Sequence, residues 1–544
     1  MRRTGRITLP KGRAVNLEAR VRTPCGRVIL VVVLVSALGA LVPSVAVAAP
    51  AETRAPTADA ALSPTLPPSP QTPWRPDPST VRTGFTPPRA DLSCFSVAAM
   101  PAGVTAEQLP SRWDWRAQGK VTPVKNQANC GSCYAFANVA GFESKLLMDG
   151  AGVFDLSENN AKECNWMHSG CHGGDGFLLA SLWSQTGTVL EACDPYLARD
   201  VGACNTSCPY QQTLLNWRLL SAASVPDTNV LKGYVYTYGP IACTLAVADE
   251  PAWYAQFSGY DGSYTLYRPG AFQTDHYVLI VGWDDSLLPR GGSVPGAWIV
   301  KNSWSSAWGG ACGFGSERGF FTIAYGSAGI GSHAGMISEW QPYDAQGGLL
   351  LFDEAGAYGI TMPNPRATAW ELVRFTPPRN GSATRVEFWT LDPMTDVDIY
   401  LYDDWDAGRG ATSHLLRSVE NLRYDTPGYF SVVIPGALPL RASDDVIAVV
   451  KFTAAVAEAN VPIDRTGPLQ QGRTYFSPTG ARGTWVDTAA TQMGNLGIRL
   501  RYTSAPLPTP TATLTPRPTP THTVTAGPRR NRAYLPIILR GAGR

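Results

Sequence analysis

Apolar and polar positions divide the chain into stretches of different period. From Cys133 to Leu147 apolar residues recur at roughly helical spacing, and Asp149 with the glycine after it supplies a stop signal. This pattern predicts a helix that begins at Cys133. Helices are expected up to about Leu220. Strands are expected from about Lys232 onward, in four apolar and β-branched runs: Gly233 to Val247, Tyr277 to Trp283, Ala297 to Ser303 and Gly319 to Tyr325.

A second pattern occupies residues 345–503. Short alternating runs such as VEFWTL, VDIYLY, YFSVVI and VIAVVKF are separated there by Asn-Gly, Pro-Gly and Asp-rich turns. Such alternation is typical of a β-sandwich. The sequence therefore predicts an α+β chain, with a helical and strand-rich domain at 109–340 followed by an all-β sandwich domain. Two folded domains also suit a length of 544 residues.

Residues 1–48 are interpreted as a signal peptide. Val28 to Val42 is almost wholly apolar, a basic stretch precedes it, and Ala46 to Ala48 fits a cleavage site. The alternative is an uncleaved membrane anchor, but an apolar run of about 15 residues is shorter than the roughly 20 that span a bilayer. We therefore expect export.

Three segments have the composition of linkers or tails. Residues 49–108 are rich in Pro, Ser and Thr, and at least their first part is predicted to be disordered. They are either a minimal pro-segment, with inhibition near Asp91 to Thr105, or a spacer. Residues 504–528 form a Pro/Thr linker, and the basic and apolar tail at 529–544 is a candidate sorting signal. The formal charge of +2, without a clustered basic face, gives no electrostatic case for a nucleic-acid partner.

The run QANCGSCYAF, from Gln127 to Phe136, contains the candidate chemistry. Its Cys133 opens the predicted helix, where the helix dipole favours the thiolate that a nucleophile needs. Gln127 can offer a side-chain amide to an oxyanion. His276 and Asn302 follow at about the spacing expected of a cysteine peptidase.

Five segments in order carry a family resemblance: LPSRWDWRAQGKVTPVKNQANCGSCYAF (109–136), DLSENNAKEC (155–164), GCHGG (170–174), DHYVLIVGW (275–283) and KNSW (301–304). Together they resemble the papain and cathepsin family of cysteine peptidases, from Leu109 to about Trp340. The resemblance implies a papain-like fold of two lobes, one helical and one β-rich. It also implies hydrolysis of peptide bonds through a thioester acyl-enzyme.

The resemblance assigns a role to each candidate residue. Cys133 is the expected nucleophile and His276 the expected acid and base. Asn302 is expected to orient the imidazole, and Trp304 to shield that contact from water. Gln127 and the Cys133 backbone N–H are expected to form the oxyanion hole.

Substrate contacts are expected at Gly173, Gly174 and Tyr277. By resemblance Gly174 pairs with the substrate backbone, although turn glycines that need a positive φ are the alternative. Tyr277 stands where a small residue is common and is expected to narrow the cleft. The chain departs from the family pattern at Tyr134, in place of tryptophan, and at Ala128 and Asn129.

Export makes disulfides permissible for the 11 cysteines. By resemblance Cys130 pairs with Cys171, and Cys164 with Cys204. Cys193 and Cys208 flank the same loop and are candidates for an additional bridge, although spacing alone fixes no connectivity. Three cysteines have no assignment: Cys94, Cys243 and Cys312. Of these, Cys243 is most simply a buried free thiol.

The sandwich region resembles the lectin-like β domains that follow papain-like domains in some secreted bacterial proteins. Its acidic cluster is interpreted as a solvated edge rather than a calcium site: Asp392, Asp396, Asp398, Asp403, Asp404 and Asp406. Its tryptophans are interpreted as core rather than as a sugar-stacking surface: Trp389, Trp405 and Trp485. No metal and no cofactor are predicted.

The sequence thus predicts a secreted papain-like cysteine endopeptidase made as a zymogen and possessing a lectin-like domain. Expected partners are protein or peptide substrates and, through the β domain, a carbohydrate or another cell-surface ligand. We expect no transmembrane span after signal removal, with retention at the cell surface through the tail. Two alternatives stay open: a non-catalytic binding protein on a papain-like scaffold, and a thioester acyl transferase.

Overall fold

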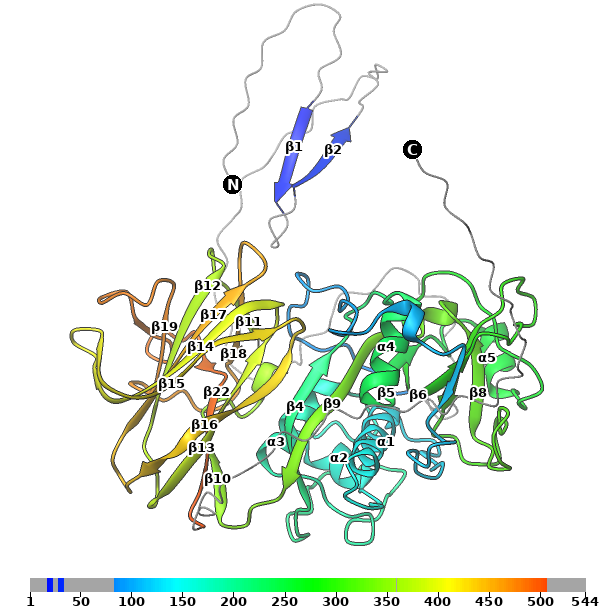
Figure 1. Cartoon of the computed structure of the whole chain (residues 1–544), viewed down its shortest axis with the longest axis horizontal. Helices are drawn as coiled ribbons and strands as arrows, with labels where there is room; N and C mark the ends of the chain where they lie inside the picture. The colour runs from blue at the N-terminus through cyan, green and yellow to red at the C-terminus, as the bar shows by residue number, and fades with distance from the viewer. Residues whose placement is uncertain (1–16, 23–27, 34–82, 359, 506–544) are drawn as a thin grey trace, which may run out of the picture. The chain divides into compact units, whose positions relative to one another are not determined.

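The computed structural model describes residues 17–22, 28–33, 83–358 and 360–505 (Figure 1). The predicted tail and nearly all of the Pro/Thr linker lie outside these residues, as do most of the predicted signal peptide and the first part of the 49–108 segment. Within the predicted signal peptide, β1 (Leu17–Arg22) and β2 (Val28–Val33) pair antiparallel. No helix of the described residues is long and apolar enough to cross a membrane.

The helices lie in the first part of the described chain. The helix predicted from Cys133 is confirmed, and it ends at Met148, one residue before the predicted stop. The helices are α1 (Cys133–Met148), α2 (Glu158–Cys164), α3 (Gly176–Gln185), α4 (Thr228–Tyr238) and α5 (Pro251–Ser258), with short 3-10 turns at Ala106–Gln108, Ser327–Gly329 and Gly356–Tyr358.

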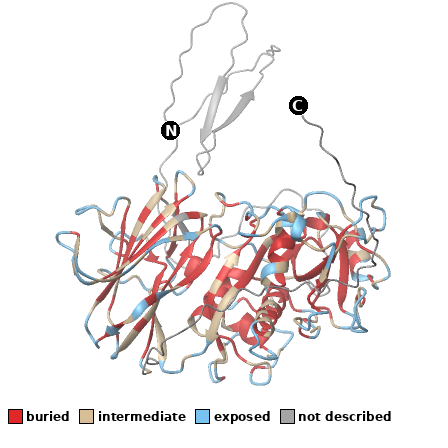
Figure 2. Cartoon of the chain, viewed as in Figure 1, coloured by how far each residue is buried: buried red, intermediate tan, exposed pale blue. Residues whose placement is uncertain are grey.

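A sheet in the order β4-β9-β5-β6-β7-β8 packs against α1, with β3 paired to β6 (Figure 1). Buried residues follow these strands and most of α1 (Figure 2). The strands are β3 (Arg112–Asp114), β4 (Gln212–Leu219), β5 (Ile241–Leu245), β6 (His276–Asp284), β7 (Ala297–Lys301), β8 (Phe320–Ala324) and β9 (Ser332–Pro342).

Two sequence predictions are wrong in this part. The strand predicted from Gly233 to Val247 begins as helix α4, because the Asp227 carboxylate accepts the N–H of Asn229 and caps it, and Gly239, at φ 108°, ends it. Only β5 is extended there. In addition, the stretch predicted to be helical up to Leu220 contains β4, whose alternation is hidden because nearly every residue of the strand is buried.

The region after β9 is all β, as predicted. Its strands belong to three sheets, the smallest of which is β11-β18-β21. An apolar core lies between the other two, with β13 and β22 contributing from one and β14 and β17 from the other. The strands are β10 (Gly347–Leu350), β11 (Ile360–Pro363), β12 (Thr368–Phe375), β13 (Gly381–Thr390), β14 (Met394–Asp406), β15 (Ala411–Tyr424), β16 (Gly428–Leu440), β17 (Val446–Ala454), β18 (Asn460–Asp464), β19 (Thr474–Ser477), β20 (Val486–Asp487), β21 (Asn495–Leu496) and β22 (Ile498–Thr503).

The sheet of the first part continues into the β region. β16 pairs with β4 through Gly428 opposite Arg218 and Tyr429 opposite Trp217. The order is therefore β10-β22-β13-β16-β4-β9 and onward, without a break at the predicted boundary between residues 340 and 345. The domain limits stay predictions, but the two parts share one sheet.

A buried ion pair strengthens this junction. The Arg499 side chain, on β22, donates from Nε to both carboxylate oxygens of Asp353 at 2.9 and 3.0 Å, and from Nη1 to the hydroxyl of Ser184 on α3 at 3.1 Å. Both charged side chains are fully buried. Each charge therefore depends on its partner, because no water replaces a lost contact.

We predict that Asp353→Asn lowers the free energy of unfolding by about 3 kcal/mol, since it leaves the buried guanidinium without a counter-charge. Thermal unfolding of the full chain, followed by circular dichroism, measures this loss. Asp425→Asn is the matched control, because Asp425 and its partner Arg423 are 59% and 70% exposed and their pair contributes little. Equal melting temperatures for the two variants would contradict the prediction.

Candidate active site

Cys133 is the first residue of α1 and is fully buried. Its sulfur accepts a hydrogen bond from the backbone N–H of Tyr277, on β6, at 3.2 Å. The start of the helix and the start of the strand therefore meet at this thiol, as the sequence spacing required.

His276 opens β6 and is also fully buried. Its Nε2 lies 2.8 Å from Oδ1 of Asn302, the residue after β7. The same Oδ1 accepts the N–H of Ser303 at 2.9 Å, so it is an acceptor and the imidazole proton lies on Nε2. Nδ1 is consequently the unprotonated nitrogen, and no described residue is bonded to it.

An aromatic cluster encloses this pair. The Trp304 ring, 3% exposed, lies with its centroid 5.3 Å from that of His276, and Phe257 packs edge-on against Trp304. Water is therefore kept from the His276–Asn302 hydrogen bond, which is the arrangement that the resemblance implies.

Gln127 is held at three points near the nucleophile. Its backbone N–H donates to the backbone carbonyl of Ser303 at 2.8 Å. Its Oε1 accepts from the hydroxyl of Ser303 at 2.5 Å. Its Nε2 donates to the carbonyl of Cys130 at 2.8 Å. The side-chain amide is thus fixed in the loop that leads to Cys133.

Disulfides join Cys130 to Cys171, Cys164 to Cys204 and Cys193 to Cys208. The first fastens the loop of the nucleophile to the GCHGG turn, and the other two fasten the loop between α3 and β4. Cys133, Cys243 and Cys312 are free thiols, and Cys243 is buried, in agreement with its interpretation from the sequence.

The cleft over Cys133 is occupied by residues of the chain itself, Thr83 to Thr86, which we call the strap. Gly84 and Phe85 donate their backbone N–H groups to the carbonyl of Asp275 at 3.1 and 3.0 Å. Gly174 donates its N–H to the carbonyl of Gly84 and accepts the N–H of Thr86, each at 3.1 Å. The strap therefore pairs with Gly174 as an added strand, parallel to it.

Phe85 is the side chain that anchors the strap. Its ring packs edge-on against Tyr277, with a centroid distance of 5.4 Å, and lies 4.6 Å from the ring of His333. A Cβ at Gly173 would lie 2.6 Å from the hydroxyl of Thr86, so the turn glycine permits this close approach. All three residues predicted to bind substrate thus contact the strap: Gly173, Gly174 and Tyr277.

Sequence reasoning missed the strap and His333. The sequence left open whether residues 49–108 are a spacer or a minimal pro-segment with inhibition near Asp91 to Thr105. The strap lies within 49–108 but outside that shorter stretch, in which Ala98 donates to the carbonyl of Leu220. The signal available in the sequence was Phe85, an isolated large aromatic residue in a Pro- and Thr-rich stretch. His333 offered no signal, because only the folded chain brings it beside Tyr277.

Burial under the strap keeps the thiol and the imidazole uncharged. Burial raises the pKa of Cys133 to about 12, although the N–H groups of Tyr277, Gly84 and Tyr134 partly oppose it. Burial likewise lowers the pKa of His276 to about 4, against the raising effect of Asn302. A thiolate–imidazolium pair is therefore unfavourable while the cleft is closed.

Comparison with known proteins identifies the first part of the chain. Residues 109–337 match the family model described as papain family cysteine protease. A cysteine proteinase of Trypanosoma brucei brucei is 33% identical over 228 residues, which are 41% of this chain and 46% of the relative. Cysteine proteinase A of Leishmania mexicana is 34% identical over 218 residues, 39% of this chain and 55% of the relative. The chain thus spans about half the length of the curated relatives it matches.

Solved structures extend the likeness into the β region. The clostridial cysteine protease Cwp84 after propeptide cleavage matches with a TM-score of 0.59 at 18% identity, over 73% of this chain and 100% of that one. A second structure contains the cysteine protease and lectin-like domains of Cwp84, a surface layer associated protein of Clostridium difficile. It matches with a TM-score of 0.59 at 17% identity, over 75% of this chain and 90% of that one. This likeness concerns the fold. Residues 109–337 therefore match the papain family and have a papain-like fold, and a large all-β region follows them, as the resemblance implied.

We predict that iodoacetamide alkylates Cys133 of the intact chain slowly at pH 7, because a pKa near 12 leaves almost no thiolate. Phe85→Asp removes the anchor of the strap and admits water, so the pKa of the thiol falls and labelling accelerates at least about tenfold. Peptide mapping by mass spectrometry measures the rate at Cys133.

Val97→Asp is the matched control, because Val97 lies in the same segment, is 38% exposed and does not contact the cleft. Labelling as slow in Phe85→Asp as in the unaltered chain would show that the strap does not protect the thiol.

Proposed function

We propose that this protein is a cysteine endopeptidase whose reacting groups are Cys133, His276 and Asn302. The observation that supports it most is the junction of α1 with β6. The sulfur of Cys133 accepts a hydrogen bond from the N–H of Tyr277, the residue after His276, and the Nε2–H of His276 donates to Asn302. Nδ1 is left as the nitrogen that can exchange a proton with the sulfur.

In this proposal the thiolate attacks the peptide carbonyl and forms a tetrahedral oxyanion, which the Gln127 amide and the Cys133 N–H stabilise. The His276 imidazolium then gives its Nδ1 proton to the leaving amine, and a thioester remains. Next, the same nitrogen takes a proton from water as the water attacks the thioester. The acid is released and the thiol is restored.

The strap makes the closed chain a latent form of this enzyme. Substrate and strap require the same N–H and carbonyl groups of Gly174, so they exclude each other. Removal or displacement of Thr83 to Thr86 is the step that admits substrate.

Cys133→Ala and His276→Ala, made in a chain that also carries Phe85→Asp, are expected to hydrolyse casein below detection, since each lacks a group that takes part in bond breaking. Asn302→Ala is expected to retain partial activity, because it removes only the orientation of the imidazole. His172→Ala is the control, as its side chain is 82% exposed. Release of acid-soluble peptides, with circular dichroism to verify folding, measures the effect. Persistent hydrolysis by pure Cys133→Ala protein would refute the proposal.

We further propose that the β region binds a carbohydrate on the outer face of its six-stranded sheet. Partly exposed aromatic side chains gather there over a small apolar cluster: Trp370, Tyr400, Tyr402, Trp405 and Trp485. The rings of Trp405 and Trp485 meet edge to face, 5.7 Å apart. Aromatic faces of this kind match the C–H faces of a sugar ring. The sequence interpretation took all three tryptophans as core: Trp389 is 1% exposed, whereas Trp405 and Trp485 are partly buried against the small apolar cluster.

The acidic residues of this region are partly used in protein contacts. Asp392 accepts from Asn460, while Asp396 and Asp398 pair with Lys451. We also propose that the protein is exported and retained at a cell surface, where the β region would meet a carbohydrate ligand. Export and retention rest on the sequence of residues 1–48 and 529–544.

We predict that the full chain sediments with insoluble peptidoglycan, chitin or cellulose, and that the double variant Trp405→Ala/Trp485→Ala weakens this binding at least about tenfold through loss of ring stacking. Trp340→Ala is the control, because Trp340 lies on β9, outside the β region, and its indole N–H donates to Asp149. Absence of sedimentation with all three polysaccharides would count against a carbohydrate ligand.

A further inference from the structure

Ser132 precedes α1 in the N-cap position, but its hydroxyl caps no helix N–H. It lies instead 2.7 Å from the phenol oxygen of Tyr196, and that phenol donates to the backbone carbonyl of Gln127 at 2.9 Å. A carbonyl only accepts, so the single phenol proton is directed to Gln127, and the hydroxyl of Ser132 donates to the phenol oxygen. One hydroxyl group thus joins both ends of the loop from 127 to 132.

These two ends bear the two donors that the proposed reaction requires. The amide of Gln127 belongs to one end, and the N–H of Cys133 follows directly after Ser132. Their separation decides whether both donors reach one oxyanion, since such donors must lie about 2.7–3.1 Å from the developing charge. Cys130, between them, forms the disulfide with Cys171, and its carbonyl accepts from Nε2 of Gln127 and from the N–H of Ser132, both at 2.8 Å. The hydroxyl of Tyr196 therefore adds a second connection between the two ends.

We propose that Tyr196 is a positioning residue that sets the separation of the two oxyanion donors through its hydroxyl group. The inference rests on the proposed function and assigns to Tyr196 a part in it. Tyr196 does not touch substrate. It acts through the backbone of Gln127 and the side chain of Ser132.

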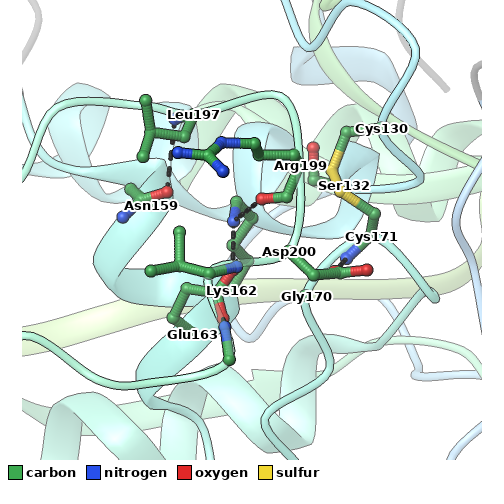
Figure 3. Close-up of polar contacts among 12 residues, drawn as sticks. Cys130, Ser132, Asn159, Lys162, Glu163, Gly170, Cys171, Leu197, Arg199 and Asp200 are labelled. Carbon is green, nitrogen blue, oxygen red and sulfur yellow. Dashed lines mark hydrogen bonds and ion pairs between the residues drawn. A yellow bond between two sulfur atoms is a disulfide. The ribbon is translucent and has the colours of Figure 1, made fainter.

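The segment that bears Tyr196 is fixed tightly enough for this task (Figure 3). Leu197 donates its N–H to Oδ1 of Asn159 at 3.2 Å, and the buried Lys162 donates to the carbonyl of Arg199 at 2.8 Å. Asp200 accepts the N–H of Cys171 at 2.6 Å, beside the Cys130–Cys171 disulfide. The loop is therefore attached to α2 and to the GCHGG turn at once.

The ring of Tyr196 has a separate packing role. It meets the ring of Phe136, on the first turn of α1, edge-on with centroids 4.8 Å apart. Tyr196→Phe keeps this contact and removes only the hydroxyl. The variant therefore separates positioning from packing.

The test compares two reactions of the same thiol in full chains that carry Phe85→Asp. Hydrolysis of a peptide amide passes through an oxyanion, whereas alkylation by iodoacetamide forms a carbon–sulfur bond, expels iodide and develops no oxyanion. With Tyr196→Phe we expect kcat for a fluorogenic peptide to fall about tenfold, because small displacements of catalytic groups have large effects on rate. KM should stay within about twofold, and the alkylation rate of Cys133 should not change.

Ser132→Ala removes the other end of the connection and is expected to give the same pattern. The double variant should be no slower than either single one, since both break one linkage. Tyr210→Phe is the control, because its ring packs on Tyr343 and not on the 127–132 loop.

Hydrolysis by Tyr196→Phe at the rate of its parent would overturn the inference, and so would an equal fall in hydrolysis and alkylation, which indicates general loosening. Failure of the parent to hydrolyse any peptide while Cys133 is alkylated would instead refute the proposed function.

Discussion

The site depends on the packing of α1 against β6. α1 brings Cys133 to the sheet, and β6 supplies both the imidazole and the N–H that binds the sulfur. The helix and the strand are within packing distance at Gly141, in the middle of α1, where a Cβ would lie at an ordinary contact distance of 3.6 Å from Leu279 on β6. β7, the neighbour of β6, then delivers Asn302. Any shift between helix and sheet would therefore separate Cys133 from His276 and Asn302.

Burial at this junction decides the charge state of the two reacting groups. Desolvation makes the charged forms of thiol and imidazole costly, so the closed site holds them neutral. The strap maintains that state with backbone hydrogen bonds and one aromatic anchor rather than with a charge. Its opening returns water to the sulfur, and the start of α1 can then favour the thiolate. The proposed latency therefore rests on desolvation of the two groups, and the proposed activation rests on its reversal.

The parts of the site that could be predicted from the sequence are those encoded locally. The helix at Cys133 has its period and its stop within 17 residues, counting from Cys133 to Asp149, and the partners of Cys133 follow at a known spacing. Contacts over long sequence distances could not be predicted. Phe85 and His333 meet only after folding, and Tyr196 reaches Gln127 through a disulfide-bridged loop. The helix α4 was missed for a different reason. Its apolar side chains also fit a strand, and only the cap at Asp227 distinguishes a helix from a strand there.

The β region is coupled to the cleft through α3. Asp175 caps the first turn of this helix, directly after the Gly174 that pairs with the strap. At its other end Arg501 donates to the carbonyl of Ser184 at 2.8 Å, and Arg499 donates to the hydroxyl of the same residue. Cations at a helix C-terminus are favoured by the exposed carbonyl groups. Because the arginines of β22 also hold buried carboxylates, the end of α3 cannot move without separating charges. The β region therefore restrains the helix that follows Gly174 in the cleft, so its packing bears on the geometry of the candidate active site as well as offering a candidate binding surface.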